Sequence, residues 1–271
     1  MSSIDPPSTI AAAPAPPAPG LLRRAARRVL PRRLRAEVAI ARRHLRDRRG
    51  GVPFATGRGD PADFPHAFEG YALPMIIYPG QEHLADGKRG NQRMMAEALH
   101  GVRVDPGEVL SLWRCTGRPS AARGYLAGAA IVAGELTSED GGGTCQLSTV
   151  LYNAGLLAGL EIVERHAHSA DVYGEDRYFE PGRDATIEYG VLDLRFRNPY
   201  PFPVLLELTS DDDRVAAAFH TPVPQLPAVA IDVEVPPAGD ATWSARTLRT
   251  VTPPGGASRR EDLGWSVYRV A

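Results

Sequence analysis

The segment 141–168 constrains the fold most strongly, because it predicts a tight turn, a buried helix and a strand in succession. It reads GGGTCQLSTVLYNAGLLAGLEIVERHAH. Three glycines give the backbone the freedom that a tight turn needs, and Thr144 is of a residue type that caps helices. Apolar residues then recur at helical spacing, namely Leu147, Val150, Leu151, Ala154 and Leu157. We therefore expect a helix that begins at Thr144 and ends before Gly159.

Cys145 falls in the first turn of this expected helix. Free backbone N–H groups and the helix dipole stabilise a thiolate at that position. The strand expected at 160–168 places His166 and His168 on one face, and a later expected strand begins at Asp184. Papain-like and transglutaminase-like thiol enzymes use the same order of Cys, His and Asp along the chain.

The candidate catalytic residues are therefore Cys145, His166 or His168, and Asp184. The thiolate would attack an acyl or amide carbon, the imidazole would act as base and then as acid, and the carboxylate would fix the imidazole tautomer. The Gln146 side chain, or the backbone N–H groups that follow the glycines, would hold the oxyanion.

Two other interpretations of these residues stay open. A lone cysteine is often a small buried hydrophobe, in which case the glycine-rich segment belongs to a non-catalytic binding module. The pair His166 and His168 is also a common metal-binding pair, to which Cys145 or Asp171 would add a ligand. We expect no cofactor, because the sequence contains neither a phosphate-binding nor a dinucleotide-binding glycine motif.

Further residues around this segment are expected to bind substrate. The expected set is Gly142, Gly143, Gln146, Ser148, Tyr152, Asn153, Arg123 and Trp113. For Trp113, Tyr152 and Asn153, a packing role is the alternative. The loop 171–183 is rich in aromatic residues and long enough to act as a lid.

The rest of the chain predicts an α+β fold. Residues 91–100 read as a helix that ends at Gly101. Alternating apolar residues predict strands from Gly182 onward, with Asp211–Asp213 as a hairpin turn. We expect a central helix, carrying Cys145 at its N-terminus, packed on a mostly antiparallel sheet, with a transglutaminase-like or papain-like arrangement.

The charges are distributed unevenly. Residues 1–50 carry twelve arginines against Asp5, Glu37 and Asp47, whereas the whole chain of 271 residues has a net charge of −1. The remainder is therefore acidic, which argues against a nucleic-acid partner. Lys88 is the only lysine.

The basic segment has its own expected structure and role. Residues 1–20 are Pro/Ala-rich and expected to be disordered, and 21–49 have helical periodicity with a break at Pro31. Such a helix can contact an anionic membrane surface. We expect no signal peptide or transmembrane helix, and a location in the cytoplasm or at the inner membrane face.

Four ordered blocks of the sequence resemble the VanW family. They are PGEVLSLW at 106–113, RGYLAGAAIVAGEL at 123–136, GGGTCQLSTVLYNAGLLAGLEIVERHAHS at 141–169 and GRDATIEYGVLDLRFRN at 182–198. The family's characteristic residues correspond to Gly141–Gly143, Cys145, Gln146, Ser148, Tyr152, Asn153, His166, His168, Ser169 and Asp184.

The resemblance implies a bacterial protein linked to the cell envelope, peptidoglycan or glycopeptide resistance, with no assigned molecular activity. The expected partners are peptidoglycan or its precursors. We expect an arm at 1–50, an N-terminal extension at 51–87, a VanW-like core at 88–210 and a C-terminal β extension at 211–271. The expected function is thiol-dependent acyl or amide transfer or hydrolysis, and the alternatives are an envelope or glycan-binding module and a metal-binding protein.

Overall fold

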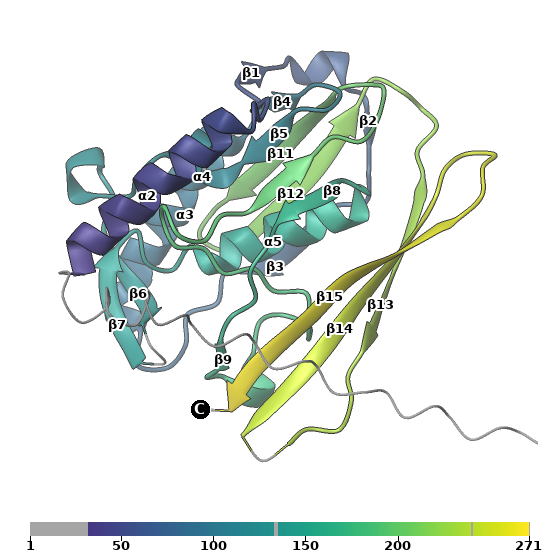
Figure 1. The fold of residues 1–271 in the computed structure, drawn as a ribbon. Helices are drawn as coiled ribbons and strands as arrows, with labels where there is room; N and C mark the ends of the chain where they lie inside the picture. The colour runs from purple at the N-terminus through teal and green to yellow at the C-terminus, as the bar shows by residue number, and fades with distance from the viewer. Residues whose placement is uncertain (1–31, 133–134, 240, 271) are drawn as a thin grey trace, which may run out of the picture.

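A computed structural model describes residues 32–132, 135–239 and 241–270 of the chain (Figure 1). The fold is α+β with mostly antiparallel sheets, as the sequence predicts. No helix in these residues has the length and apolar character needed to cross a bilayer. The expected disorder of 1–20 and the expected helix at 21–31 lie outside the described residues.

The largest sheet has six strands and carries much of the core. Its order is β1-β4-β11-β12-β2, and β3 pairs with another part of β12. The strands are β1 (Gly57–Arg58), β2 (His66–Ala67), β3 (Tyr71–Pro74), β4 (Val102–Val104), β11 (Val204–Ser210) and β12 (Arg214–Thr221). The predicted hairpin turn at Asp211–Asp213 joins β11 to β12. The β11–β12 hairpin thus spans residue 210, which is the expected end of the VanW-like core. The expected domain limits stay a prediction.

Helix α5 (Cys145–Leu157) lies at the centre of the molecule (Figure 1). It packs against β12 and β3 of the six-stranded sheet and against β13 (Ala228–Glu234). Residues from Gln146 to Leu156 are all buried. Such a helix needs apolar or internally bonded side chains on every face, which explains why its sequence contains no charged residue.

A second helix and two small sheets complete the core. Helix α3 (Ala85–Leu99) packs on β11 and begins earlier than the expected helix at 91–100. One three-stranded sheet has the order β5-β10-β8, and β6 and β7 form a hairpin. These elements are β5 (Val109–Ser111), α4 (Leu112–Thr116), β6 (Ala127–Val132), β7 (Glu135–Asp140), β8 (Glu161–Glu164) and β10 (Arg195–Arg197).

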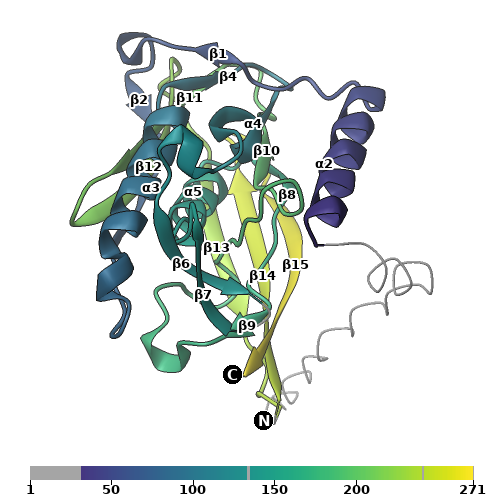
Figure 2. The same ribbon diagram turned by 90° about the vertical axis from the view of Figure 1, so that its left-hand side faces the viewer.

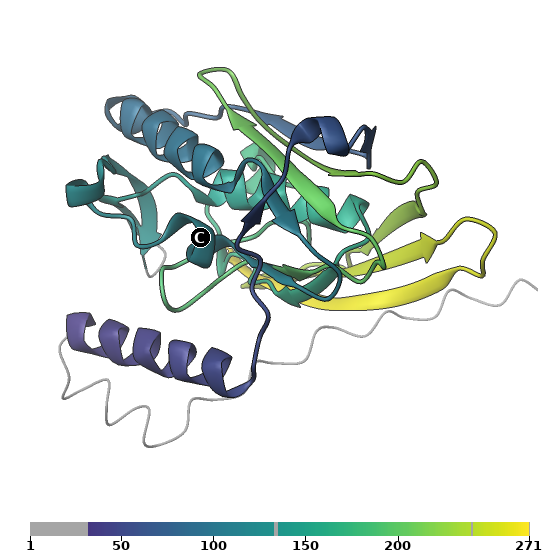
Figure 3. The same cartoon turned by 90° about the horizontal axis from the view of Figure 1, so that it is seen from above.

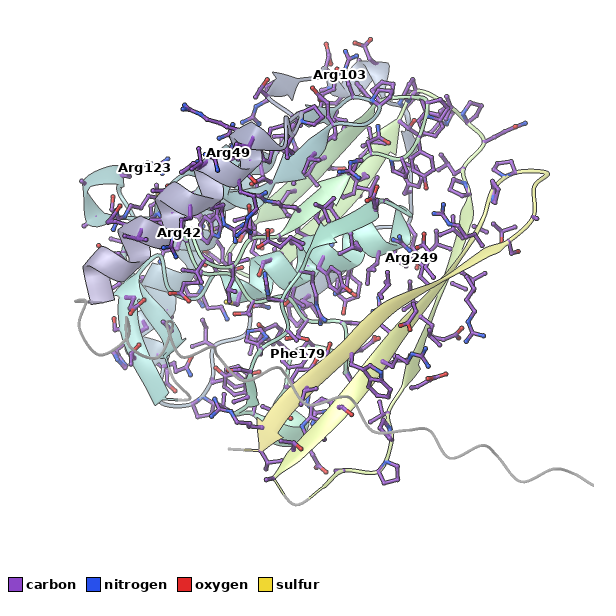
Figure 4. All side chains as sticks on the ribbon, viewed as in Figure 1. Arg42, Arg49, Arg103, Arg123, Phe179 and Arg249 are labelled. Atoms are coloured by element: carbon purple, nitrogen blue, oxygen red, sulfur yellow. The ribbon has the colours of Figure 1, made fainter. Side chains whose placement is uncertain are left out.

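The C-terminal strands form a separate four-stranded sheet against α5. Its order is β13-β14-β15-β9, with β14 (Thr242–Thr252), β15 (Arg259–Val270) and the short parallel strand β9 (Ala170–Asp171). Arg249 on β14 is 1% exposed and donates to the Leu156 carbonyl at the C-terminal end of α5. A cation is favourable at that end of a helix dipole. Figure 4 shows Arg249 between this sheet and the helix.

Helix α2 (Arg32–Arg49) is the described part of the basic arm, and it runs along one side of the molecule (Figures 2 and 3). Arg195 of β10 donates to both carboxylate oxygens of Asp47, at 2.8 and 2.9 Å, and both side chains are buried. Arg43 makes a second two-point contact, with Glu164. In the described part of the arm, buried and half-buried ion pairs therefore help to hold the helix against the domain.

Two expected strands differ from the structure. The strand expected at 160–168 ends at Glu164, and 184–187 form no strand. The backbone of 184–187 instead bonds to helix side chains and to the His166 carbonyl. Ala185 N donates to Thr149 Oγ1, its carbonyl accepts from Ser148 Oγ, and Thr186 N donates to His166 O. These bonds replace a strand ladder and draw Asp184 toward α5.

Candidate functional site

The turn before Cys145 depends on close backbone packing. A side chain on Gly142 would collide with the Gly128 carbonyl, and one on Gly143, at φ +83°, would lie 2.6 Å from Lys88 Cγ. The glycines thus provide space as well as backbone freedom. The expected Thr144 side-chain cap is wrong, because Thr144 Oγ1 donates to the Gly141 carbonyl and accepts no helix N–H.

Cys145, His168 and Asp184 lie together at the start of α5. His168 Nδ1 is 2.5 Å from Asp184 Oδ2, and the imidazole lies close enough to the Cys145 side chain for each group to shift the pKa of the other. Because Asp184 holds Nδ1, the ring nitrogen that remains available to the sulfur is Nε2. Thr186 Oγ1 is 3.6 Å from Cys145 Sγ, and the Ile187 N–H also points to the sulfur.

These contacts shift the proton affinities of all three groups. Burial raises the pKa of Cys145, but His168 first, and then the Ile187 N–H and Thr186, together outweigh burial and lower the pKa below the ordinary thiol value. Burial lowers the pKa of His168, while Asp184 and then Cys145 raise it, to about 10. Burial raises the pKa of Asp184, and His168 and Arg165 lower it overall. These opposed shifts favour the thiolate–imidazolium pair over the neutral thiol–imidazole pair.

Asp184 is fully buried and is held on every side. Its Oδ2 accepts a second bond, from the backbone N–H of His168, at 2.7 Å. Its Oδ1 accepts from Arg165 Nη2 at 2.8 Å and from Tyr268 Oη at 2.5 Å. Four donors fix this carboxylate and, through it, the orientation of the imidazole.

The loop expected to be a lid packs on the imidazole. Phe179 stacks on His168 with ring centroids 5.5 Å apart and an interplanar angle of 9°. Tyr178 meets the same ring edge-on. Figure 4 shows Phe179 beside β15, below α5. The loop therefore forms a wall of the site.

A cavity of about 520 Å³ lies beside Cys145. Its described lining includes Gly142, Gly143, Gln146, His168, Lys88, Trp113, Arg118, Tyr78, Tyr173 and Tyr178. Tyr78 and Tyr173 stack face to face at 3.7 Å. A site of this size, lined by aromatic rings and a few polar groups, has the dimensions of a small-ligand site.

His166 lies apart from His168, so the expectation that the two share a face is wrong. Its Nε2 is 3.0 Å from Glu164 Oε1, and it lines a different cleft, between β8 and β15. The chain leaves its extended path after Glu164 because the His168 N–H turns to Asp184. The structure thus brings together one of the two candidate histidines with Cys145 and Asp184.

Several side chains expected to bind substrate are instead bonded within the protein. Gln146 Nε2 donates to the Pro74 carbonyl at 2.5 Å, which ties β3 to the helix. Ser148 donates to the Ala185 carbonyl, and Asn153 donates to the Arg183 carbonyl while accepting from its guanidinium. The Arg165 guanidinium lies over the ring of Tyr152. Neither Ser148, Tyr152 nor Asn153 is among the described residues that line the Cys145 cavity.

Trp113 and Arg123 are placed differently. Trp113 lines the cavity, donates to the Leu192 carbonyl and meets Tyr189 edge-on. Arg123 is exposed at the end of a short 3-10 helix (Ala121–Arg123), far from Phe179 in Figure 4, and donates to the Arg118 carbonyl.

The two cysteines are free thiols. Burial raises the pKa of Cys115 to about 11. No group of three or more His, Cys, Asp or Glu side chains in the described parts of the chain is arranged to hold a metal ion. Asp171, the expected extra ligand, accepts from Gly174 N and from Arg177.

Four residues at the site carry no role in the sequence interpretation: Lys88, Arg165, Thr186 and Tyr268. The sequence does single out Lys88, because a single lysine in an arginine-rich chain is unusual. No sequence pattern singles out Tyr268, since it lies 84 residues from Asp184. The C-terminal sheet, to which β15 belongs, brings the two residues together.

Comparison with known proteins finds one matching family and two similar proteins, and each match lies within less than half of this chain. The family described as "VanW like protein" matches residues 87–220. The chain is 40% identical over 116 residues to "Uncharacterized protein YoaR" of Bacillus subtilis (strain 168), covering 43% of this chain and 37% of that protein. It is 33% identical over 131 residues to "Vancomycin B-type resistance protein VanW" of Enterococcus faecalis (strain ATCC 700802 / V583), covering 48% of each.

The matched region thus spans less than half the length of either relative. No solved structure matches the chain.

Proposed function

Because residues 87–220 belong to the VanW-like family, we propose that this domain is a thiol enzyme of the bacterial cell envelope. Its reaction would be acyl or amide transfer or hydrolysis, in a transglutaminase-like or papain-like arrangement. The observation that carries the proposal is the placement of Cys145 beside His168, which is hydrogen bonded to Asp184, at the edge of a cavity.

The chemistry follows from the positions of the three groups. The Cys145 thiolate adds to a carbonyl carbon, and His168 Nε2 gives its proton to the departing amine as the carbon–nitrogen bond breaks. A thioester remains on Cys145. Water, or a second amine, then attacks the thioester, gives a proton to His168 and releases the acid or the new amide.

Two features of the site support this role over packing. A structural cysteine in apolar surroundings has a raised pKa, as Cys115 has. The pKa of Cys145 is lowered despite its burial, by His168 first and then by Ile187 N–H and Thr186. Groups with such opposed shifts in one cavity are typical of acid–base pairs in enzymes.

The substrate class is a peptide or amide of peptidoglycan or its precursors. The support is the relationship to a protein named for vancomycin B-type resistance. The alternative that the experiment must distinguish from this enzyme is a non-catalytic module that binds the cell envelope.

Peptidoglycan stem peptides and purified sacculi, incubated with the protein and analysed by mass spectrometry, test the proposal. We expect a loss or gain of water or amine at a peptide bond with the wild type and with Cys115→Ser, and none with Cys145→Ala. Cys145→Ser would retain at most a small fraction of the rate, because a hydroxyl ionises far less readily than a thiol. Binding to sacculi that is equal in wild type and Cys145→Ala, without any turnover, would instead support the binding module.

A further inference from the structure

Lys88 is the only lysine of the chain, and its side chain is 8% exposed. It lies in the first turn of α3 and lines the same cavity as Cys145. Its stem passes against Gly143, where a side chain on the glycine would collide with Lys88 Cβ and Cγ. The absence of a side chain at Gly143 therefore lets a lysine approach the thiol.

The ammonium of Lys88 has unused bonding capacity. Its Nζ donates to the Ile76 carbonyl at 2.6 Å and lies 6.0 Å from the centre of the Tyr178 ring. An ammonium has three donors, and no carboxylate of the described residues forms an ion pair with this one. Burial lowers the pKa of Lys88 to about 8, and the Cys145 thiolate opposes that shift. Apart from the Cys145 thiolate, no anion of the described residues offsets the cost of burying this cation, and a carboxylate of a ligand would do so.

The other cations of the described cavity lining already have anionic partners. The His168 imidazolium lies between the Cys145 thiolate and the Asp184 carboxylate. The Arg118 guanidinium, which also lines the cavity, is exposed and pairs with Glu37 on α2 at 2.7 Å. Lys88 is thus the buried cation of the described cavity lining that forms no ion pair with a carboxylate, so it can bind the carboxylate of a ligand.

We propose that Lys88 binds a carboxylate of the substrate, beside the carbonyl that Cys145 attacks. This assignment rests on the proposed function and narrows its substrate class. It selects acyl compounds with a free carboxylate near the reacting bond, such as the C-terminal residue of a peptide.

Two alkylating agents that differ in charge test the assignment without knowledge of the substrate. Iodoacetate and iodoacetamide have similar size, and each forms a Sγ–carbon bond with the thiolate as iodide leaves. The ratio of their second-order rate constants at Cys145 cancels the intrinsic reactivity of the thiol and reports the stabilisation of a carboxylate. Mass spectrometry of the modified peptide separates Cys145 from Cys115.

We expect Lys88→Met to lower the iodoacetate-to-iodoacetamide ratio by about tenfold, as for the loss of a charge-assisted hydrogen bond. Lys88→Arg, which keeps the charge, should retain most of the ratio. Arg118→Gln is the matched control, since it removes an exposed cation of the same cavity, and we expect less than about a twofold change. A ratio that is unchanged in Lys88→Met, or lowered equally by Arg118→Gln, would overturn the assignment.

A measurement on the unmodified chain covers the case in which Lys88→Met does not fold. N-acetylglycine should slow alkylation of Cys145 by iodoacetamide, and the neutral N-acetylglycinamide should not at the same concentration. Equal protection by the two compounds, or none by either, would rule out the carboxylate site.

The alkylation experiments distinguish a failure of the carboxylate assignment from a failure of the proposed thiol-enzyme function. If Cys145 reacts with iodoacetamide only at the pH of an ordinary thiol, the thiol-enzyme proposal fails irrespective of Lys88. If Cys145 reacts below the pH of an ordinary thiol, but the iodoacetate-to-iodoacetamide ratio is the same in the wild type and in Lys88→Met, only the carboxylate assignment fails.

Discussion

At the scale of the residue, the two histidines of the His-x-His sequence have different environments. The side chain of His168 is 15% exposed and lies between Cys145 and Asp184, whereas that of His166 is 38% exposed and bonds to Glu164. Spacing of two residues places side chains on one face only while the strand continues. Here the strand ends at Glu164, so one backbone N–H that bonds to a carboxylate decides which histidine reaches the thiol.

His168→Ala tests this difference at the thiol. The pKa of Cys145 is lowered by His168 against the effect of burial, so removal of the imidazole leaves burial dominant and moves the pKa upward. One pKa unit changes the thiolate fraction tenfold below the midpoint, and we expect alkylation by iodoacetamide at pH 7 to slow by at least about tenfold.

The pH dependence of the same rate supplies the measurement. In the wild type the rate should stay high as pH falls below the ordinary thiol range, and in His168→Ala its midpoint should rise above that of the wild type. His166→Ala is the control and should leave the profile unchanged. A profile altered by His166→Ala rather than by His168→Ala would contradict the assignment.

At the scale of the element, helix α2 is joined to the domain by charge. Asp47 and Arg195 form a two-point buried pair, and Arg195 also contacts Asp193. The outer side of the helix exposes Arg42 and Arg49, which Figure 4 labels. Contact of this face with an anionic membrane surface stays a proposal, supported by the exposed arginines.

Asp47→Asn should loosen α2. Removal of one partner of a buried pair costs about 3–5 kcal/mol when the other charge is left alone. Because Arg195 keeps Asp193, we expect the free energy of unfolding to fall by about 2 kcal/mol. Urea denaturation measures the change, and faster tryptic cleavage within α2 would accompany it.

Glu37→Gln is the matched control, since it breaks the exposed pair with Arg118 on the same helix. Its expected effect is below about 1 kcal/mol. Equal destabilisation by the two substitutions would mean that the buried pair does not hold the helix.

At the scale of the whole molecule, the C-terminal sheet contributes to the site although three of its four strands, β13, β14 and β15, lie outside residues 87–220. Tyr268 of β15 donates to Asp184, and Ser266 accepts from Arg165. Burial and then Asp184 raise the pKa of Tyr268 well above its ordinary value, so this hydroxyl stays protonated and remains a donor.

Tyr268→Phe should therefore affect both stability and the thiol. Loss of one buried hydrogen bond to a carboxylate lowers the free energy of unfolding by about 2 kcal/mol. Asp184 keeps Arg165 and His168, so the midpoint of alkylation should rise by less than in His168→Ala. Arg260→Gln, an exposed change on the same strand, should alter neither. Unchanged stability and alkylation in Tyr268→Phe would show that the sheet does not support the site.

Local sequence determined the parts of this protein that depend on neighbours along the chain. Helical spacing predicts α5, which begins at Cys145, and alternation predicts the β11–β12 hairpin. Both follow from short-range periodicity and turn chemistry. The four sequence blocks likewise indicate a resemblance to the VanW family, whose model matches residues 87–220, without reference to the shape of this region.

Tertiary structure alone decided how those parts meet. It ended the histidine strand at Glu164, turned 184–187 toward α5, and brought Lys88 and Tyr268 to the site. The physical reason is that buried polar groups must find partners wherever the fold supplies them. Here those partners come from residues far apart in the sequence, which no local pattern encodes.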